Sequence, residues 1–272
     1  MAAQEPGTTA GAPQHRATLA PHQYPRRVLL AVSGLSPQIL TETLYALAVA
    51  TDPPFIPTEL QILTTVEGAE RARLSLLSDD PGWFKRLCRD YGLKPPVFGL
   101  DQIQLITDAN GRALEDIREL EDNASVADQL IARVRDLTAD PDSALHVSLA
   151  GGRKTMGYYA GYALSLFGLP QDRLSHVLVA APFEQSWNFF YPTPYSRVIE
   201  TKDGKLADTK DAIAYKLDSL GEDVRGLFGR TWLLSAREPT ETLIARARRA
   251  RIRLVPPAQL QQLRDLVRKW RG

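Results

Sequence analysis

One stretch of the chain, "SLAGGRKTMGYYAGYAL" at positions 148–164, has side chains suited to holding a charged ligand. The end of an apolar strand is followed by Gly151 and Gly152, then by Arg153 and Lys154, and then by aromatic and small residues at helical spacing. A glycine-led turn that opens a helix offers backbone N–H groups and the positive end of the helix dipole, which together favour a phosphate. The stretch therefore predicts a phosphate site that two cations strengthen.

Familiar nucleotide and hydrolase motifs do not describe this stretch. A nucleoside-triphosphate P-loop needs glycine immediately before its lysine, and Arg153 stands there. The chain also lacks a G-x-G-x-x-G pattern after its first predicted strand and a G-x-S-x-G nucleophile elbow. An isolated G-G-R-K-T run is more often a tight turn with two solvated cations, so the position of the run in the fold must decide its meaning.

Short apolar runs alternate with helical patterns along the chain. Strands are predicted at Val28–Val32, Glu59–Thr65, Leu145–Leu149 and Leu174–Ala180, with one or two more within 97–106. This βαβα order predicts an α/β fold, a doubly wound and mostly parallel sheet of Rossmann type, because parallel neighbours need crossover helices. Ligands of such sheets collect beyond the carboxyl ends of the strands, where the segments "SGLSPQ", "TTVEGAE" and "AGGRKTM" should converge.

Composition divides the chain into three parts, a disordered tail at 1–26, the α/β domain at 27–205 and a small, mainly helical and basic C-terminal region at 206–272. From Arg225 onward there are 12 basic residues against 3 acidic ones, a net +9, whereas the rest carries 21 against 29, a net −8. Such a basic segment suits nucleic acid, an acidic partner or the chain's own acidic body. An apolar stripe from Leu260 to Trp270 indicates a last helix.

A single cysteine, Cys88, and four histidines exclude a disulfide and a Cys/His zinc cluster within one chain. His146 and His176 alternate with apolar residues, so we interpret both as sheet residues rather than catalytic ones. No metal spacing stands out among the carboxylates. The chain lacks a secretory signal pattern and an apolar run of membrane-spanning length, which favours a soluble protein of the reducing cytoplasm without membrane association.

Several long motifs, in order, resemble a known family. They are "AVSGLSPQILTETLYAL", "ELQILTT", "LCRDYGL", "DIRELEDNASVAD", "LHVSLAGGRKTMGYYAGYALSLFGLPQDRLSHVLV" and "FFYPTP". Together they resemble the CRISPR-associated ring nucleases, which are built on a CARF (CRISPR-associated Rossmann-fold) domain. The resemblance covers about 27–220 and does not convincingly reach the tail or the basic C-terminal segment.

The resemblance implies a homodimer that binds a cyclic oligoadenylate across its twofold axis, most often cyclic tetra-adenylate. An isologous dimer suits such a ring, because equivalent phosphates meet equivalent residues. The resemblance also implies cleavage without a metal or other cofactor. A ribose 2′-OH attacks the adjacent phosphodiester and leaves a linear product with a 2′,3′-cyclic phosphate, while the protein aligns the groups and stabilises charge.

By position in the motifs, the resemblance gives Lys154 the role of charge stabiliser, with Arg153 in second place. It gives Ser33 or Ser36 a role in positioning ribose or phosphate. The expected ligand-binding residues come from the same loops and from one helix start; they are Gly34, Ser36, Thr64, Thr65, Glu67, Asn123, Ala150, Gly151, Gly152, Thr155 and Met156. Helix capping would equally explain Ser36, with Pro37 opening the first helix, and Asn123, near the start of the helix after 119. We assign no general base.

A binding module is the alternative, a cyclic-oligoadenylate sensor whose basic C-terminal region contacts nucleic acid or a partner effector. Some CARF proteins activate a fused HEPN ribonuclease with an R-x4-6-H pattern. The only match to that pattern runs from Arg16 to His22, in the predicted tail, and the region after Leu220 is short for such a domain. A fused HEPN ribonuclease is therefore not expected, which leaves open a ring-activated enzyme acting through the C-terminal region by other chemistry.

Overall fold

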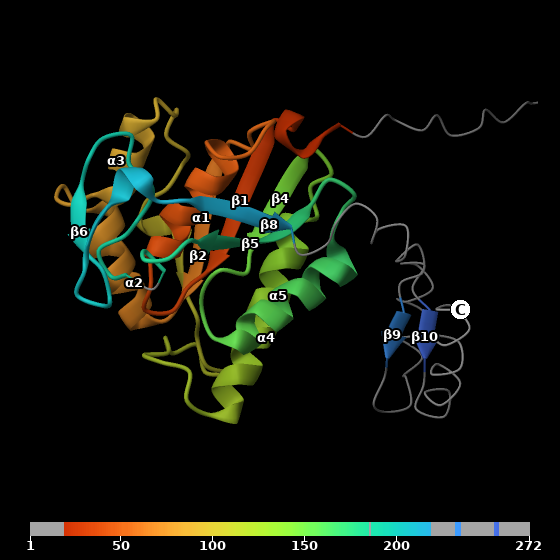
Figure 1. Cartoon of the computed structure of the whole chain (residues 1–272). Coiled ribbons are helices and arrows are strands. Elements are labelled where there is room, and N and C mark those ends of the chain that lie inside the picture. Colours follow the sequence, from red (N-terminus) through yellow and green to blue (C-terminus); the bar gives the residue numbers. More distant parts are fainter. Residues whose placement is uncertain (1–18, 185, 219–231, 235–252, 256–272) are drawn as a thin grey trace, which may run out of the picture.

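The computed structural model describes residues 19–184, 186–218, 232–234 and 253–255 of the chain (Figure 1). The strands are β1 (Arg26–Val32), β2 (Glu59–Thr64), β3 (Ile103–Leu105), β4 (Ser143–Ser148), β5 (Arg173–Val179), β6 (Val198–Glu200), β7 (Leu206–Asp208), β8 (Ala214–Asp218), β9 (Trp232–Leu234) and β10 (Arg253–Val255). The α-helices are α1 (Gln38–Ala48), α2 (Val66–Ala72, continued by a π turn to Leu77), α3 (Trp83–Asp90), α4 (Leu120–Leu137) and α5 (Lys154–Phe167). Short 3₁₀ turns lie at Pro21–Gln23, Leu100–Gln102 and Thr209–Asp211.

The main sheet has the order β3-β2-β1-β4-β5-β8. Its first five strands are parallel neighbours, and β8 pairs antiparallel with β5 at the edge. The chain winds outward from β1 to β3 and then returns to β4 on the other side of β1, so the direction of winding reverses between β1 and β4. This reversal is the topological switch point, where ligands of doubly wound sheets bind.

Both faces of the sheet are covered by helices, as the alternation along β1 requires. Leu29 and Ala31 belong to a buried cluster with α1, α2 and α3, whereas Val28, Leu30 and Val32 pack in a second cluster with α4 and α5. Figure 1 shows α1–α3 on one side of the strands and α4 and α5 on the other. The predicted doubly wound α/β fold is thereby confirmed.

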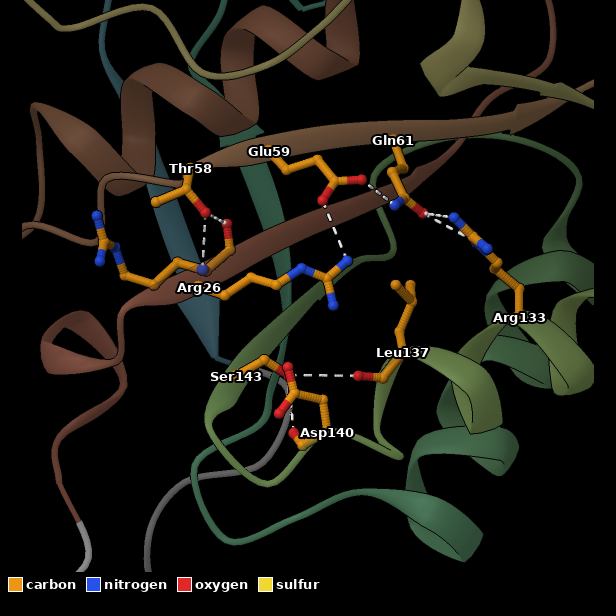
Figure 2. Close-up of polar contacts among 9 residues, drawn as sticks. Arg26, Thr58, Glu59, Gln61, Arg133, Leu137, Asp140 and Ser143 are labelled. Carbon is orange, nitrogen blue, oxygen red and sulfur yellow. Dashed lines mark hydrogen bonds and ion pairs between the residues drawn. The ribbon is translucent and has the colours of Figure 1, made fainter.

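A chain of polar side chains ties the amino ends of β1 and β2 to α4, and we call it the amino-edge network (Figure 2). Arg26 Nη2 lies 3.1 Å from Glu59 Oε2, and Gln61 Nε2 donates to the same carboxylate. Arg133, from α4, donates through Nε and Nη2 to Gln61 Oε1 at 2.9 and 2.6 Å. Gln61 is buried, and its carbonyl and amide groups both have partners.

The starts of two helices differ from the sequence predictions. Helix α1 begins at Gln38 after Pro37, which makes no side-chain cap, and Ser36 is exposed. Helix α4 begins at Leu120 with Glu119 as its N-cap, so Asn123 lies inside the first turns and is not the cap. Asp122, in the first turn, accepts from the backbone N–H groups of Arg118 and Glu119 at 3.0 and 3.1 Å, which fixes the earlier beginning of α4.

The region from residue 206, for which a mainly helical extension is expected, is described only in part. The described residues there form β7, a 3₁₀ turn, β8, β9 and β10, and the strands β9 and β10 pair in parallel. Strand β8 forms because it pairs with the free edge of β5, and such pairing outweighs a local helical pattern. The predicted stripe from Leu260 to Trp270 lies outside the described residues.

The predicted N-terminal tail is described only from Leu19, where a 3₁₀ turn and the buried Tyr24 precede β1. Residues 1–18 lie outside the described residues. Among the described helices, none has the length and apolar character needed to cross a membrane.

Candidate functional site

The loops after β1, β2 and β4 meet in close contact at the switch point, as the sequence predicts. A Cβ atom on Gly151 would lie 2.7 Å from the carbonyl oxygen of Val32 and 2.6 Å from Cδ1 of Ile39. A Cβ on Gly68, in α2, would lie 2.6 Å from the carbonyl oxygen of Gly34. Because any side chain would force these backbones apart, the glycines are what allow the three loops to converge.

The turn into α5 has the geometry of a helix start that is open to an anion. Gly152 has a positive φ of 76°, a conformation that side chains other than glycine rarely adopt. Arg153 is the N-cap, its side chain makes no capping hydrogen bond, and Lys154 is the first residue of the helix. Gly152, Arg153, Lys154 and Thr155 are all exposed, so the start of α5 can be reached by a ligand.

The two cations of this turn have different surroundings. Arg153 Nη2 donates to both carboxylate oxygens of Asp116, at 3.0 and 3.1 Å, and this interaction lowers the pKa of Asp116 below its usual value. The side chain of Lys154 is exposed and has no hydrogen-bond or ion-pair partner among the residues that the structure describes. Lys154 is therefore the cation that is free to meet a phosphate, and Arg153 is engaged.

Two buried side-chain atoms in the described part of the chain lack a hydrogen-bond partner, and both lie at the carboxyl edge of the sheet. They are Oγ1 of Thr64, the last residue of β2, and Oε1 of Gln38, the first residue of α1. Thr64 is 0% exposed and Gln38 is 7% exposed. Buried polar groups are nearly always paired, so an unpaired one calls for an explanation. A ligand with polar groups would supply one.

Thr64 is one of the residues that the sequence predicts for the site, whereas Gln38 is not. The position of Gln38 directly after the "SGLSP" loop is the signal that could have marked it as a candidate. Gln38 Nε2 donates to the carbonyl oxygen of Trp187 at 3.0 Å, which links α1 to the long loop after β5. One turn further along α1, burial raises the pKa of Glu42 to about 8, so at neutral pH most of this carboxyl group is protonated and does not repel an anion.

Two of the predicted site residues, Ser33 and Thr65, hold the loops in shape. Ser33 is buried, and its Oγ donates toward the carbonyl oxygens of Gly34 and Ser36, both at 3.3 Å. Thr65 caps α2, because its Oγ1 accepts from the backbone N–H of Gly68 at 3.4 Å. Ser33 and Thr65 thus fix the positions of the first two loops.

Of the remaining predicted residues, some have side chains that are paired with other side chains, and others support the turn by packing or through a backbone hydrogen bond. Glu67 forms an exposed ion pair with Arg71 at 3.0 Å, and Asn123 Nδ2 donates to Tyr159 Oη at 2.7 Å. Met156 is buried in the cluster beneath α5, so it supports the turn from below. The backbone N–H of Ala150 donates to Ser148 Oγ at 3.3 Å.

The histidine interpretation is confirmed for His146, which lies buried in β4 with Nε2 2.6 Å from Ser175 Oγ. Burial lowers the pKa of His146 to about 3, so the ring is neutral at physiological pH. His176 is an exposed residue of β5. Within the described ranges, no group of three or more His, Cys, Asp or Glu side chains could hold a metal ion.

Comparison with protein families gives two matches along the chain. The model described as CRISPR-associated protein NE0113 matches residues 36–220, which is more than half of the 272 residues. The model described as a Card1-like endonuclease domain matches residues 194–272. This second match covers the basic C-terminal segment, which the resemblance to the ring nucleases does not convincingly reach.

No curated protein matches the chain. Among solved structures, a crystal structure of a candidate UDP-N-acetylglucosamine 2-epimerase from Listeria monocytogenes is 16% identical over 56% of this chain. The match covers 31% of that protein, with a TM-score of 0.26. The chain thus spans less than a third of this relative's length, and a likeness of this size carries no argument about function.

Proposed function

The chain belongs to the family of the CRISPR-associated protein NE0113, and on this premise we propose that it binds a cyclic oligoadenylate at the carboxyl edge of its sheet and linearises it. The CRISPR-associated resemblance of the sequence is confirmed by this membership. The ring ligand, its cleavage and a homodimeric assembly belong to the proposal. Its expected effect is to switch off type III CRISPR signalling.

The observation that carries the proposal is the unpaired Lys154 at the start of α5, beside two glycines at the switch point. A phosphodiester placed there would meet backbone N–H groups, the positive helix end and a free ammonium group. Arg153 contributes indirectly, because its ion pair with Asp116 occupies it and leaves Lys154 as the cation in reach.

The proposed step conserves every atom of the ring. The ribose 2′-oxygen forms a bond to the adjacent phosphorus, the bond from phosphorus to the 5′-oxygen breaks, and the 5′-oxygen ends with the proton that the 2′-OH gives up. The product is a linear oligoadenylate with a 2′,3′-cyclic phosphate. Lys154 would stabilise the charge that develops on the phosphoryl oxygens, an effect that is often the largest single contribution to catalysis.

The test is incubation of the pure protein with labelled cyclic tetra-adenylate in the presence of EDTA, with separation of cyclic and linear products. We expect linear products from the natural protein and a loss of about 100-fold or more in rate for Lys154→Ala. Lys94→Ala, at an exposed lysine after α3, is the matched control and should keep the natural rate. Intact ring after prolonged incubation, with binding retained, would leave a sensor and reject the enzyme.

A second candidate function rests on the match of residues 194–272 to the Card1-like endonuclease domain. In this case ring binding would control nucleic-acid binding or cleavage by the C-terminal region, whose net charge of +9 from Arg225 onward favours a polyanion. The discriminating measurement is binding and cleavage of single-stranded and duplex nucleic acid, with and without cyclic tetra-adenylate and divalent metal, across a salt series. Absence of salt-sensitive binding and of cleavage in every condition would remove this candidate.

A further inference from the structure

The loop between β5 and β6 buries most of its aromatic side chains. Phe183, Phe189, Phe190 and Tyr191 are buried, whereas Trp187 is 61% and Tyr195 is 42% exposed. An indole is the largest apolar side chain, and exposing it leaves a wide flat surface in contact with water. Trp187 is therefore the most exposed aromatic side chain of its loop.

The exposed position of Trp187 is fixed by the anchoring of its loop. On the side toward β6, Phe190 stacks on Trp83 of α3 with ring centroids 4.9 Å apart, and Tyr191 Oη donates to Asp90 at 2.9 Å. Tyr91 Oη donates to the carbonyl oxygen of Pro192 at 2.6 Å. The segment that carries Trp187 is thus held against α3, and the indole is not at the tip of a loosely attached loop.

Trp187 lies beside the candidate site, because it contacts one residue of α1 and one of α2, the helices that follow the loops at the carboxyl edge. Its carbonyl oxygen accepts from Gln38 Nε2, on the first residue of α1, and the guanidinium carbon of Arg71, in α2, lies 5.9 Å from the centre of its ring. The residue after Gln38 is Ile39, whose Cδ1 would lie only 2.6 Å from a Cβ on Gly151, in the turn before α5. The chain of contacts from the turn to the indole is therefore short.

Gln38 contributes a second feature that points to a ligand. Its amide nitrogen is directed to the carbonyl oxygen of Trp187, so the amide cannot be reversed without losing that hydrogen bond. The amide oxygen, on a side chain that is only 7% exposed, is the unpaired acceptor described above. The side chain that donates to the Trp187 backbone thus also carries an acceptor that lacks a donor, and the exocyclic amine of adenine is a donor on the edge of a flat ring.

We propose that the Trp187 indole is the stacking platform for one adenine of the ligand and that Gln38 Oε1 accepts a hydrogen bond from its exocyclic amine. This inference rests on the proposed function and extends it, since it names the residues that read the base and not the phosphate. Aromatic stacking recognises any base, whereas the acceptor favours a base with an amine. The two residues together favour adenine over a base that lacks an exocyclic amine, such as hypoxanthine.

The first experiment measures the affinity of the full chain for cyclic tetra-adenylate. Trp187→Ala is expected to weaken binding about tenfold or more, whereas Trp187→Phe, which keeps an aromatic face, should stay within about threefold of the natural protein. Tyr215→Ala removes another exposed aromatic residue, on β8, and serves as the matched control with unchanged affinity. Equal binding by the natural protein and Trp187→Ala would overturn the inference and leave the proposed function intact.

The second experiment separates base recognition from ring recognition. The protein is titrated with adenosine and inosine 5′-monophosphates, and saturable quenching of tryptophan fluorescence is compared with that of Trp187→Phe. We expect quenching that depends on Trp187 and favours the adenosine nucleotide, and Gln38→Leu should abolish that preference, which a merely structural role for Gln38 would not affect. Quenching by the mononucleotide without any binding of the ring would reject the proposed function and retain the platform. No quenching dependent on Trp187 by mononucleotide or ring would overturn the inference.

Discussion

The two ends of the parallel strands treat their polar side chains in opposite ways. At the amino ends, Arg26, Glu59, Gln61 and Arg133 form a continuous network, and the buried Gln61 has partners for both ends of its amide (Figure 2). At the carboxyl ends, Thr64 Oγ1 and Gln38 Oε1 are buried without partners. The polar network at the amino edge is therefore complete, whereas two buried polar atoms at the carboxyl edge lack a hydrogen-bond partner.

The amino edge of the sheet thus stabilises the fold, whereas the carboxyl edge has buried polar groups that a ligand could pair. A buried polar atom without a partner costs about 1–3 kcal/mol, so each one lowers the stability of the protein that carries it. Residues 59 and 61 of β2 belong to the amino-edge network, and residue 64 ends the same strand at the other edge. Within six residues, one strand thus contributes to stability at its start and to the candidate site at its end.

The largest effect is expected from breaking the amino-edge network at its centre. Gln61→Leu removes the amide but keeps a similar volume, which leaves the half-buried Arg133 without its acceptor and should lower the free energy of unfolding by about 3 kcal/mol. Urea denaturation measures the change. The double variant Gln61→Leu with Arg133→Met should recover part of the loss, because no charged group then lacks a partner.

A cost below about 1 kcal/mol for Gln61→Leu would contradict the contrast between the edges, since the amino-edge network would then add little stability. Affinity for cyclic tetra-adenylate should be unchanged in this variant.

The next effect concerns the close approach of loops at the carboxyl edge. A Cβ on Gly68 would lie 2.1 Å from Thr64 Oγ1 and 2.6 Å from the carbonyl oxygen of Gly34, so Gly68→Ala must push α2 away from the first loop. We expect a loss of about 2 kcal/mol in stability together with weaker ring binding. Gly157→Ala, in α5, is the control, because its Cβ would meet only Leu149 Cδ2 at 3.7 Å.

The Gly157→Ala control should be neutral or slightly stabilising, since alanine favours a helix over glycine by up to about 1 kcal/mol. If Gly68→Ala behaved in the same way, the packing of the three loops would not depend on glycine.

A smaller effect on stability is expected at low pH from His146, which is buried in β4 between the two edges. The pKa of His146 is about 3 in the folded chain and near 6.5 when unfolded, so between these values only the unfolded chain takes up the proton. The stability that the neutral His146 contributes is therefore present above about pH 6.5 and is lost as the pH decreases toward 3. Between pH 7 and 5.5, His146 should account for a loss of about 1 kcal/mol.

Urea denaturation of the natural protein and of His146→Gln at the two pH values measures this contribution. The variant should lose about 1 kcal/mol less between pH 7 and 5.5. An identical loss in both proteins would show that other groups govern acid stability.

Much of the fold follows from local pattern. The strands from Val28, Glu59 and Leu145 are short apolar runs followed by helical periods, and a doubly wound sheet is the arrangement that buries them on both faces. The turn before α5 could be predicted for the same reason, because glycines such as Gly151 and Gly152 mark by themselves a tight turn of the backbone. Features encoded within about ten residues could thus be predicted.

The features that could not be predicted depend on partners distant in sequence. The ion pair of Arg153 with Asp116 joins positions 37 residues apart, and it decides which of two adjacent cations is free. Strand β8 was expected to be helical because its pairing with β5 leaves no local signal. The position of Gln38 after the first loop could have marked the residue, but the missing partner of its Oε1 depends on all the neighbours of that atom and has no sequence signal.

The smallest expected change in stability is also the sharpest test of the contrast between the edges, because its sign is opposite to that of the others. Thr64→Val removes the unpaired hydroxyl and keeps the shape, so it should raise the free energy of unfolding by about 0.5–1 kcal/mol while ring binding weakens. Thr43→Val is the matched control, since its buried hydroxyl lies 3.1 Å from Ser148 Oγ and its removal should destabilise. Urea denaturation and ring titration of both variants separate the cases. Equal destabilisation by the two substitutions would mean that the Thr64 hydroxyl is satisfied within the protein, and the carboxyl edge would then no longer differ from the amino edge at that residue.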